Sequence, residues 1–233
     1  YKSLHSAYHI PCDEINSLLR DRFNNIWLGS IGGGVLMIDT KQSPFAFYSL
    51  NLAEDDVPTT AVRALFADAD KDLWLGTGSY GLARKDYETG VLSFFSHIPE
   101  FSDIPGVPTV NYIIQRKNGE VWFATYDGGI LIYEKGEKVK VLTESDTPYL
   151  YSDCVSALCE DSKGNCWVGC RGGMGISLAD GGHYRFGTLS FAGGGVADWY
   201  HVKDIVEDAD GSFWIATANY GIIHIMGDVQ HPE

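Results

Sequence analysis

The sequence has no long hydrophobic run. Nowhere in its 233 residues do about 18 apolar residues follow one another, so we expect no membrane insertion by this segment. Basic residues are also few, because 17 lysines and arginines stand against 31 aspartates and glutamates and give a net charge of −14. Such an acidic surface repels phosphate backbones and argues against a nucleic-acid partner. The chain has no initial methionine and no apolar leader, so we expect a processed protein or an excised segment.

Cysteines are few, and their number is odd. They are Cys12, Cys154, Cys159, Cys166 and Cys170. They cannot all pair within one chain, and they lack the paired CxxC spacing of a zinc site, so we expect buried thiols. A Cys159–Cys166 disulfide across one hairpin is an alternative that the sequence does not decide.

Metal and cofactor motifs are missing as well. The run Asp68-x-Asp70-x-Asp72 resembles the start of a calcium loop, but Leu73 and Ser79 stand where that loop needs glycine and glutamate. We therefore assign this run to a turn, and we expect no metal and no cofactor.

Tryptophans, in contrast, are regularly spaced. Trp27, Trp74, Trp122, Trp167 and Trp214 are separated by 47, 48, 45 and 47 residues. Alignment on them brings further columns into register: aspartate six residues before in four repeats, a small residue two after, and glycine about seven after. An internal repeat of this length is typical of β-propellers.

Each repeat divides into four short strands. Residues 62–67 form an apolar run, 68–72 have turn chemistry, and 73–77 form a second run that ends in Gly-Thr. The turn at 78–81 leads to a third strand and Thr89-Gly90 to a fourth. We label these strands A to D. Four antiparallel strands per repeat of about 45 residues predict one propeller blade.

The predicted fold is therefore all-β, a propeller of five four-stranded blades that forms a single domain over residues 1–233. The repeat cores lie near 15–39, 62–86, 110–134, 155–180 and 202–226. The fifth repeat ends after its third strand, and Tyr1–Ser6 resembles the fourth strands. Pairing of these ends would close the ring and remove two sheet edges, which we slightly favour over five blades of a larger ring.

The segment Asp208-Ala209-Asp210-Gly211-Ser212-Phe213-Trp214-Ile215-Ala216-Thr217 resembles the two-component regulator propeller repeat, and its D-x-x-G-x-x-W-[ILV]-[GA]-T core recurs with local variation in all five units. In that family the repeats form the sensory region of hybrid histidine kinases, outside the inner membrane, and sense glycans or similar nutrients. The resemblance implies a periplasmic sensory module with an attached or partner signalling domain.

A ligand site is expected where the B–C turns and the long D–A connections meet, because variable loops on a rigid scaffold carry recognition. The second residue of each A strand is polar and would ring the mouth of the central channel. Aromatic, amide and cationic side chains suit a sugar or an acidic small molecule. The candidate ligand-binding residues are Asn16, Arg63, Tyr80, Asn111, Tyr126, Arg171, Trp199, Lys203 and Tyr220; Ser156 completes the ring of second positions.

Two other function classes remain open. A propeller glycoside hydrolase needs paired carboxylates, and the predicted ring contains none. A lyase needs a histidine base near a metal or cation, and of the seven histidines only His201 falls beside the mouth. There is no G-x-S-x-G elbow and no HExxH helix. We therefore predict a binding module without catalytic residues; the alternatives are an enzyme and a protein-interaction platform.

Overall fold

The computed structural model describes residues 14–31, 34–38, 46–48, 61–78, 81–95, 98–104, 106, 109–186, 188–190, 196–198, 201–228 and 231–232. These residues form β-strands and turns, with one short 3-10 helix, η2 (Pro99–Phe101). The chain divides into two compact units, Tyr1–Val110 and Asn111–Glu233. Each unit is described by itself.

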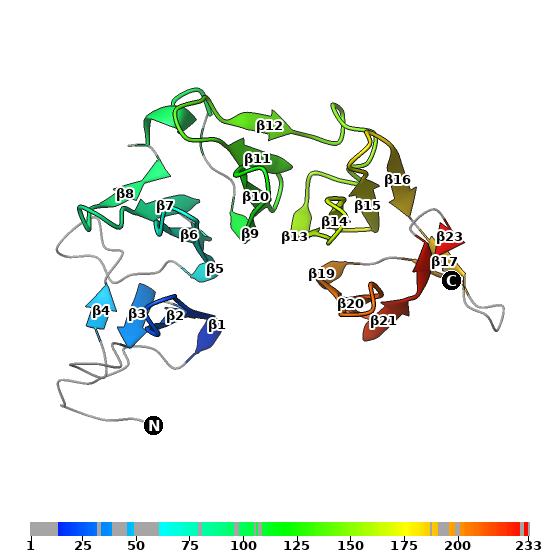
Figure 1. The fold of residues 1–233 in the computed structure, drawn as a ribbon, viewed down its shortest axis with the longest axis horizontal. Coiled ribbons are helices and arrows are strands. Elements are labelled where there is room, and N and C mark those ends of the chain that lie inside the picture. The colour runs from blue at the N-terminus through cyan, green and yellow to red at the C-terminus, as the bar shows by residue number, and fades with distance from the viewer. Residues whose placement is uncertain are drawn as a thin grey trace. The chain divides into compact units, whose positions relative to one another are not determined.

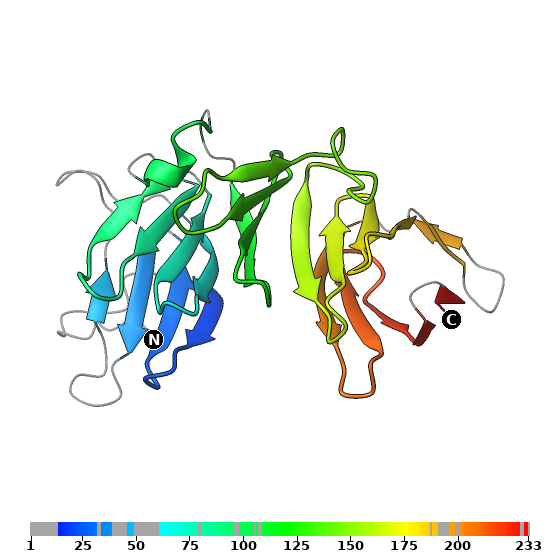
Figure 2. The same ribbon diagram turned by 45° about the horizontal axis from the view of Figure 1, so that its top comes forward.

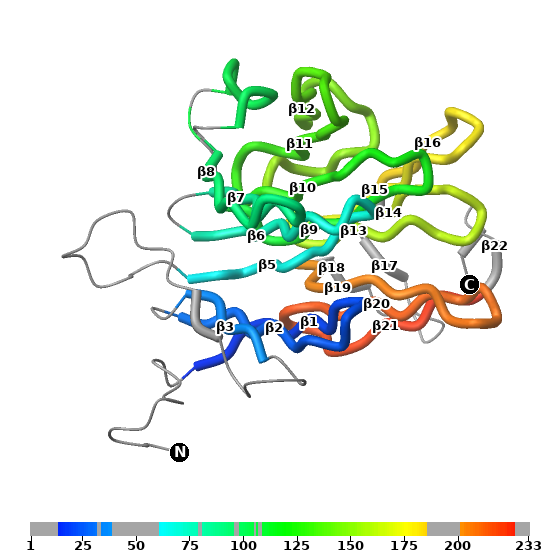
Figure 3. The backbone as a smooth tube through the Cα atoms, turned by 60° about the vertical axis from the view of Figure 1, so that its left-hand side comes forward, coloured from blue at the N-terminus to red at the C-terminus, as the bar shows by residue number. Residues whose placement is uncertain are grey.

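The first unit contains two four-stranded antiparallel sheets whose strands are paired in chain order (Figure 1). Blade 1 consists of β1 (Ile15–Arg20), β2 (Ile26–Ser30), β3 (Gly34–Ile38) and β4 (Ala46–Tyr48). Blade 2 consists of β5 (Val62–Ala67), β6 (Leu73–Thr77), β7 (Leu82–Lys85) and β8 (Leu92–Phe94). Strand β5 packs against β1 and β2, as the blue and cyan tubes of Figure 3 show.

The second unit contains blades 3 to 5. Blade 3 consists of β9 (Val110–Gln115), β10 (Val121–Thr125), β11 (Ile130–Tyr133) and β12 (Lys140–Leu142). Blade 4 consists of β13 (Val155–Glu160), β14 (Cys166–Cys170), β15 (Gly173–Ser177) and β16 (His183–Phe186). Blade 5 shows β19 (Val202–Glu207), β20 (Phe213–Thr217) and β21 (Ile222–Ile225). Strand β19 packs on β13 and β14 (Figure 2).

Two small hairpins accompany these blades. One pairs β17 (Thr188–Ser190) with β18 (Val196–Asp198), and the other pairs β22 (Gly227–Asp228) with β23 (His231–Pro232). The predicted all-β arrangement of five propeller blades is confirmed. The segment Tyr1–Ser6, proposed from the sequence to complete the last blade, lies outside the described residues.

The repeat tryptophans form the contacts between consecutive blades. Trp167 is 1% exposed and stacks on Phe213 of blade 5, with 3.8 Å between the ring centroids. Trp27 packs in the same way with Val62 and Leu75 of blade 2. Trp214 of blade 5 differs, because it remains 43% exposed and, among the described residues, stacks on His224 of its own blade. Trp27 and Trp167 are therefore buried by the blade that follows in the same unit.

The small residue two positions after each tryptophan makes room for that following blade. A Cβ atom on Gly169 of blade 4 would lie 2.4 Å from Val202 Cγ1, at the start of β19. A Cβ on Gly29 of blade 1 would lie 3.1 Å from Val62 Cγ1, at the start of β5. Close approach of the next A strand thus requires a residue with little or no side chain at this position.

The disulfide that the sequence left open is not formed, since Cys154, Cys159, Cys166 and Cys170 are free. The register gives the reason: Cys159 lies opposite Trp167, and Cys166 lies opposite Glu160. Neighbouring residues of a strand point to opposite faces, so the two thiols point away from each other. Among the described residues no helix is long and apolar enough to cross a membrane.

Candidate functional site

The second residue of the A strand lies at a β-bulge in blades 1, 2, 4 and 5. The pairing register shifts between Ile15 and Ser17, between Val62 and Ala64, and at the matching places of blades 4 and 5. The residues at these shifts are Asn16, Arg63, Ser156 and Lys203. A bulge redirects the side chain of the extra residue, so the positions predicted to ring the channel have a distinct local geometry.

Two of the five predicted ring residues bind neighbouring backbone. Asn111 donates its amide to the carbonyl oxygen of Val155, the first residue of the next A strand, at 3.1 Å. Ser156, buried at 8% exposure, donates its hydroxyl in the same way to the carbonyl oxygen of Val202. Both side chains therefore link consecutive A strands, a structural role that the sequence reading did not anticipate.

The remaining predicted residues of the described chain are exposed. On the A strands these are Asn16, Arg63 and Lys203, and in the B–C turns they are Tyr126, Arg171 and Tyr220. Tyr80 and Trp199 lie outside the described residues. In each unit, therefore, the described A-strand and turn positions include solvent-exposed polar or aromatic side chains.

Within the second unit, Arg171 and Lys203 lie close to His201. Arg171 and His201 form an antiparallel bridge, and Ala218 donates its backbone N–H to the His201 carbonyl oxygen at 2.9 Å. Arg171 in turn donates its backbone N–H to the carbonyl oxygen of Cys154 at 2.9 Å. We call Arg171, His201 and Lys203 the cationic cluster. It joins the B–C turn of blade 4 to the start of blade 5.

The charges in this cluster affect each other. Burial, followed by the charges of Lys203 and Arg171, lowers the pKa of His201 below its ordinary value. The imidazole is therefore neutral at pH 7, with one nitrogen able to donate and the other able to accept a hydrogen bond. Among the described residues neither Arg171 nor Lys203 has an ion pair within 4.0 Å. The cluster thus offers two positive charges and a neutral imidazole to a solvent-borne ligand.

The opposite end of the blades is occupied by a structural network. The carboxylate of Asp161 accepts the backbone N–H of Asn165 at 2.8 Å and the indole N–H of Trp167 at 3.0 Å. The same aspartate-to-indole bond joins Asp21 to Trp27, Asp68 to Trp74 and Asp208 to Trp214. The sequence showed the aspartate column as turn chemistry, but the indole partner six residues away was missed.

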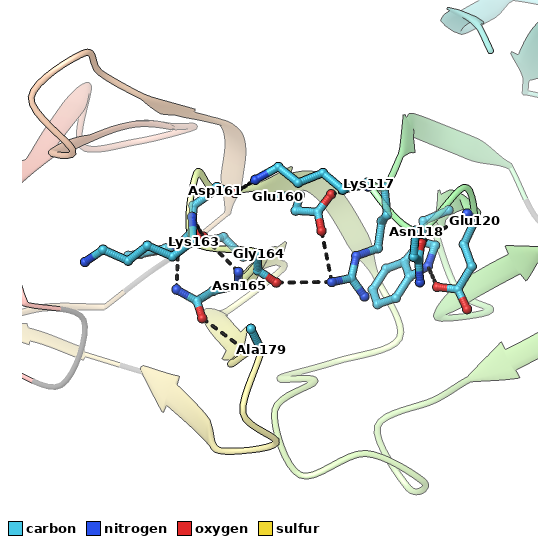
Figure 4. Close-up of polar contacts among 12 residues, drawn as sticks. Lys117, Asn118, Glu120, Glu160, Asp161, Lys163, Gly164, Asn165 and Ala179 are labelled. Carbon is cyan, nitrogen blue, oxygen red and sulfur yellow. Dashed lines mark hydrogen bonds and ion pairs between the residues drawn. The ribbon is translucent and has the colours of Figure 1, made fainter. Parts of the chain in front are cut away.

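In blade 3 a different residue accepts the hydrogen bond of the tryptophan indole. Arg116 stands in the aspartate column, and Glu120 accepts the Trp122 indole N–H at 2.9 Å. The Arg116 guanidinium lies over the Trp122 ring at 4.8 Å from its centroid. Figure 4 shows the neighbouring Lys117, which donates its ammonium to the carbonyl oxygen of Asp161 at 2.7 Å. These contacts tie the A–B turns of blades 3 and 4 together.

The carboxylates of the calcium-like run are also engaged by the protein. Asp68 accepts the backbone N–H of Asp72 and the indole of Trp74, while Asp72 accepts the backbone N–H of Tyr87 at 2.9 Å. In the described part of the chain no group of three histidine, cysteine, aspartate or glutamate side chains is placed to hold a metal ion.

A model of the family described as two component regulator propeller matches residues 9–32 and 152–172. These segments contain the A strand, turn and tryptophan strand of blade 1 and the same elements of blade 4. The chain contains two-component regulator propeller repeats. The resemblance inferred from the tryptophan and aspartate columns is thereby confirmed. No curated protein matches the chain.

Solved structures share the fold of this chain. The extracellular domain of a hybrid two component system from B. thetaiotaomicron is 16% identical, with a TM-score of 0.54, over 97% of this chain and 35% of that one. PorZ, a surface component of the type-IX secretion system of Porphyromonas gingivalis, is 19% identical, with a TM-score of 0.64, over 94% and 33%. The chain thus spans about a third of the length of these two proteins.

The fold of the regulator repeats also occurs in enzymes. Virginiamycin B lyase from Staphylococcus aureus is 14% identical, with a TM-score of 0.58, over 93% of this chain and 85% of the lyase. Identities this low show a shared propeller fold and leave function to the residues of the site.

Proposed function

We propose that this chain is the sensory propeller of a two-component signalling protein and binds an acidic saccharide or a similar anionic nutrient without converting it. The observation that carries the proposal is the cationic cluster of Arg171, His201 and Lys203, which lies on a propeller built from regulator repeats. Binding would be read out by an attached or partner signalling domain, in the periplasm.

The charge distribution supports an anionic ligand. The chain as a whole carries a net charge of −14, yet two exposed cations converge beside His201. An arginine presents a planar fork that matches a carboxylate or sulfate, and a lysine adds a point charge. The neutral imidazole can donate a hydrogen bond to a hydroxyl or accept one from it. Exposed tyrosines in the B–C turns, Tyr126 and Tyr220, offer ring faces on which a sugar could stack.

Calorimetric titration with uronate oligosaccharides and their neutral counterparts tests the proposal. We expect the acidic sugars to bind, the neutral ones to bind at least about tenfold more weakly, and affinity to fall as salt rises. Arg171→Ala and Lys203→Ala should each weaken binding about five- to tenfold, which corresponds to about 1 kcal/mol or slightly more.

A matched control is Lys163→Ala, which removes an exposed cation from the A–B turn of the same blade. It should leave the affinity unchanged. Equal affinities of all three variants would overturn the assignment of the site. Trp199→Ala and Arg63→Ala extend the test to the other predicted residues.

The same protein variants and sugars distinguish the enzyme alternative from the sensor proposal. A neutral histidine beside two cations could also act as a general base, as a lyase would need. Release of an unsaturated product from a uronate oligosaccharide, lost in His201→Ala, would replace the sensor proposal by a lyase. If no saccharide binds and the chain instead forms a complex with another protein, the interaction-platform alternative holds.

A further inference from the structure

The first unit contains a cavity of about 230 Å³ at the A–B turn end of blades 1 and 2. Its walls come from the β1–β2 turn, the β5–β6 turn and the β7–β8 turn. None of the residues proposed above for saccharide binding lines it. We call it the turn pocket; its main lining residues are Phe23, Trp27, Lys71, Leu73, Lys85 and Tyr87.

The walls of the turn pocket are aromatic. The rings of Phe23 and Tyr87 are parallel, with 5.6 Å between their centroids and 1° between their planes. Both are large apolar side chains left partly open, at 40% and 45% exposure. Trp27 and Leu73 add further apolar surface from the blade interiors. A planar, apolar group would therefore find ring faces and ring edges to pack against.

Two ammonium groups lie among these rings. The Lys71 Nζ lies 4.6 Å from the Tyr87 centroid, and the Lys85 Nζ lies 5.3 Å from the Trp27 centroid. Within the described residues Lys71 has no ion pair within 4.0 Å. A lysine held over a ring keeps its positive charge, which can attract an anion from solvent.

The carboxylates that line the turn pocket accept hydrogen bonds from their own turns. Asp21 accepts the backbone N–H groups of Phe23 and Asn25, the Asn25 amide and the Trp27 indole. Asp86 accepts the backbone N–H and the hydroxyl of Thr89, both at 2.8 Å. These bonds engage both oxygens of Asp21 and one oxygen of Asp86 within their own turns, while the Lys71 ammonium lies over the Tyr87 ring.

Lys71 occupies an unusual position for a lysine. Its φ is 77°, in the left-handed region, and glycine occupies this turn position in three other repeats as Gly119, Gly164 and Gly211. A lysine pays more conformational energy there than a glycine does. The sequence thus places a charged side chain over the turn pocket, at a position where the backbone conformation favours glycine.

We propose that the turn pocket binds a small aromatic carboxylate. The volume selects one ring, since a cavity of about 150 Å³ already holds benzene and pockets for drug-sized ligands begin near about 300 Å³. The apolar walls accept the ring, and the Lys71 ammonium pairs with the carboxylate. A saccharide fits less well, because its hydroxyls need several hydrogen-bond partners and the walls of the pocket are mainly apolar.

Benzoate, benzyl alcohol and glucuronate are suitable probes, followed by the indole N–H signal of Trp27 in a ¹H–¹⁵N correlation spectrum. We expect benzoate to bind with a dissociation constant of about 0.1–1 mM and to shift that signal, because Trp27 lines the pocket. Benzyl alcohol should bind about tenfold more weakly, since it keeps the ring and loses the charge.

Lys71→Gly is the decisive variant. Glycine is the residue of the equivalent turns, so the fold is expected to be retained while the ammonium is lost. Benzoate affinity should fall about five- to tenfold and benzyl alcohol affinity should not change. Phe23→Ala should weaken both probes. Lys163→Ala, on the equivalent turn of blade 4, is the control and should weaken neither.

An unchanged benzoate affinity in both Lys71→Gly and Phe23→Ala would overturn the proposal, as would no shift of the Trp27 signal up to about 10 mM benzoate. Glucuronate binding that depends on Lys71 would instead make the pocket a sugar site. Arg171→Ala should leave benzoate binding intact, so failure at the cationic cluster and failure at the turn pocket are distinguishable.

Discussion

Replacement of Asp161 by alanine should be among the most damaging single changes at an A–B turn. The carboxylate accepts four hydrogen bonds: from the backbone N–H groups of Lys163 and Asn165, from the Asn165 amide and from the Trp167 indole. It is 2% exposed, and Trp167 and Asn165 are buried as well. The variant removes the acceptor and leaves these donors in place.

The magnitude follows from which donors water can reach. The Asn165 backbone N–H and the Trp167 indole are buried, and each buried donor without an acceptor costs about 1–3 kcal/mol. Lys163 is exposed and can bond to water. We therefore expect a loss of about 3–5 kcal/mol, which for a chain of this size corresponds to a drop in Tm of about 6–20 °C. Asp208→Ala should cost only about 1 kcal/mol, because the Trp214 it serves is 43% exposed.

Urea unfolding, followed by both tryptophan fluorescence and far-ultraviolet circular dichroism, measures these differences. Coincident transitions are needed before a single free energy of unfolding is assigned. Blade 3 suggests a rescue: its indole acceptor, Glu120, stands two residues before the tryptophan, where blade 4 has Asn165. Asn165→Glu should therefore restore about 1 kcal/mol in the Asp161→Ala background. Equal losses for the Asp161 and Asp208 variants would refute the reasoning.

Three further outcomes follow from the packing of blades 4 and 5. Gly169→Ala should cost about 1–3 kcal/mol in urea unfolding, because its Cβ would lie 2.4 Å from Val202 Cγ1; adding Val202→Ala should cost less than the sum of the two single changes. Trp167→Ala should cost about 3–5 kcal/mol and Trp214→Ala distinctly less, because the two side chains are 1% and 43% exposed. Burial raises the pKa of the Cys166 thiol to about 12, so iodoacetamide at pH 8 should leave it unmodified in the folded protein and alkylate it in urea, as peptide mass spectrometry would show.

The blade pattern was predictable because it depends on contacts close in sequence. Tryptophan, a small residue two positions later and glycine about seven positions later all lie on one hairpin, so each repeat shows the same spacing. The aspartate column was also visible, but of the two kinds of hydrogen bond that it accepts only the one within the turn could be predicted. Its bond to the backbone of the turn follows from known turn chemistry, whereas its bond to the indole depends on how strand B is oriented above the turn.

The predicted ring was harder to interpret, because its polar side chains look alike in sequence. Asn111 and Ser156 reach the carbonyl of the next A strand, while Lys203 lies exposed beside His201. Whether a polar side chain at this position bonds to the next A strand or stays exposed depends on the distance between two blades. No pattern within one repeat encodes that distance. The turn pocket was missed for the same reason, since Phe23 and Tyr87 lie on different blades.

The repeat pattern does not predict how deeply equivalent residues of different blades are buried. The residue paired with the small residue of the tryptophan strand is Val35, Leu82, Ile130 and Met174 in blades 1 to 4, and none of these is more than 1% exposed. In blade 5 it is Ile222, which is 70% exposed. The residues at this position are equally apolar in all five blades, so the difference in exposure arises from the packing of each blade against its neighbour. A repeat therefore encodes a face to be buried, and the adjacent blade decides how much stability that face contributes.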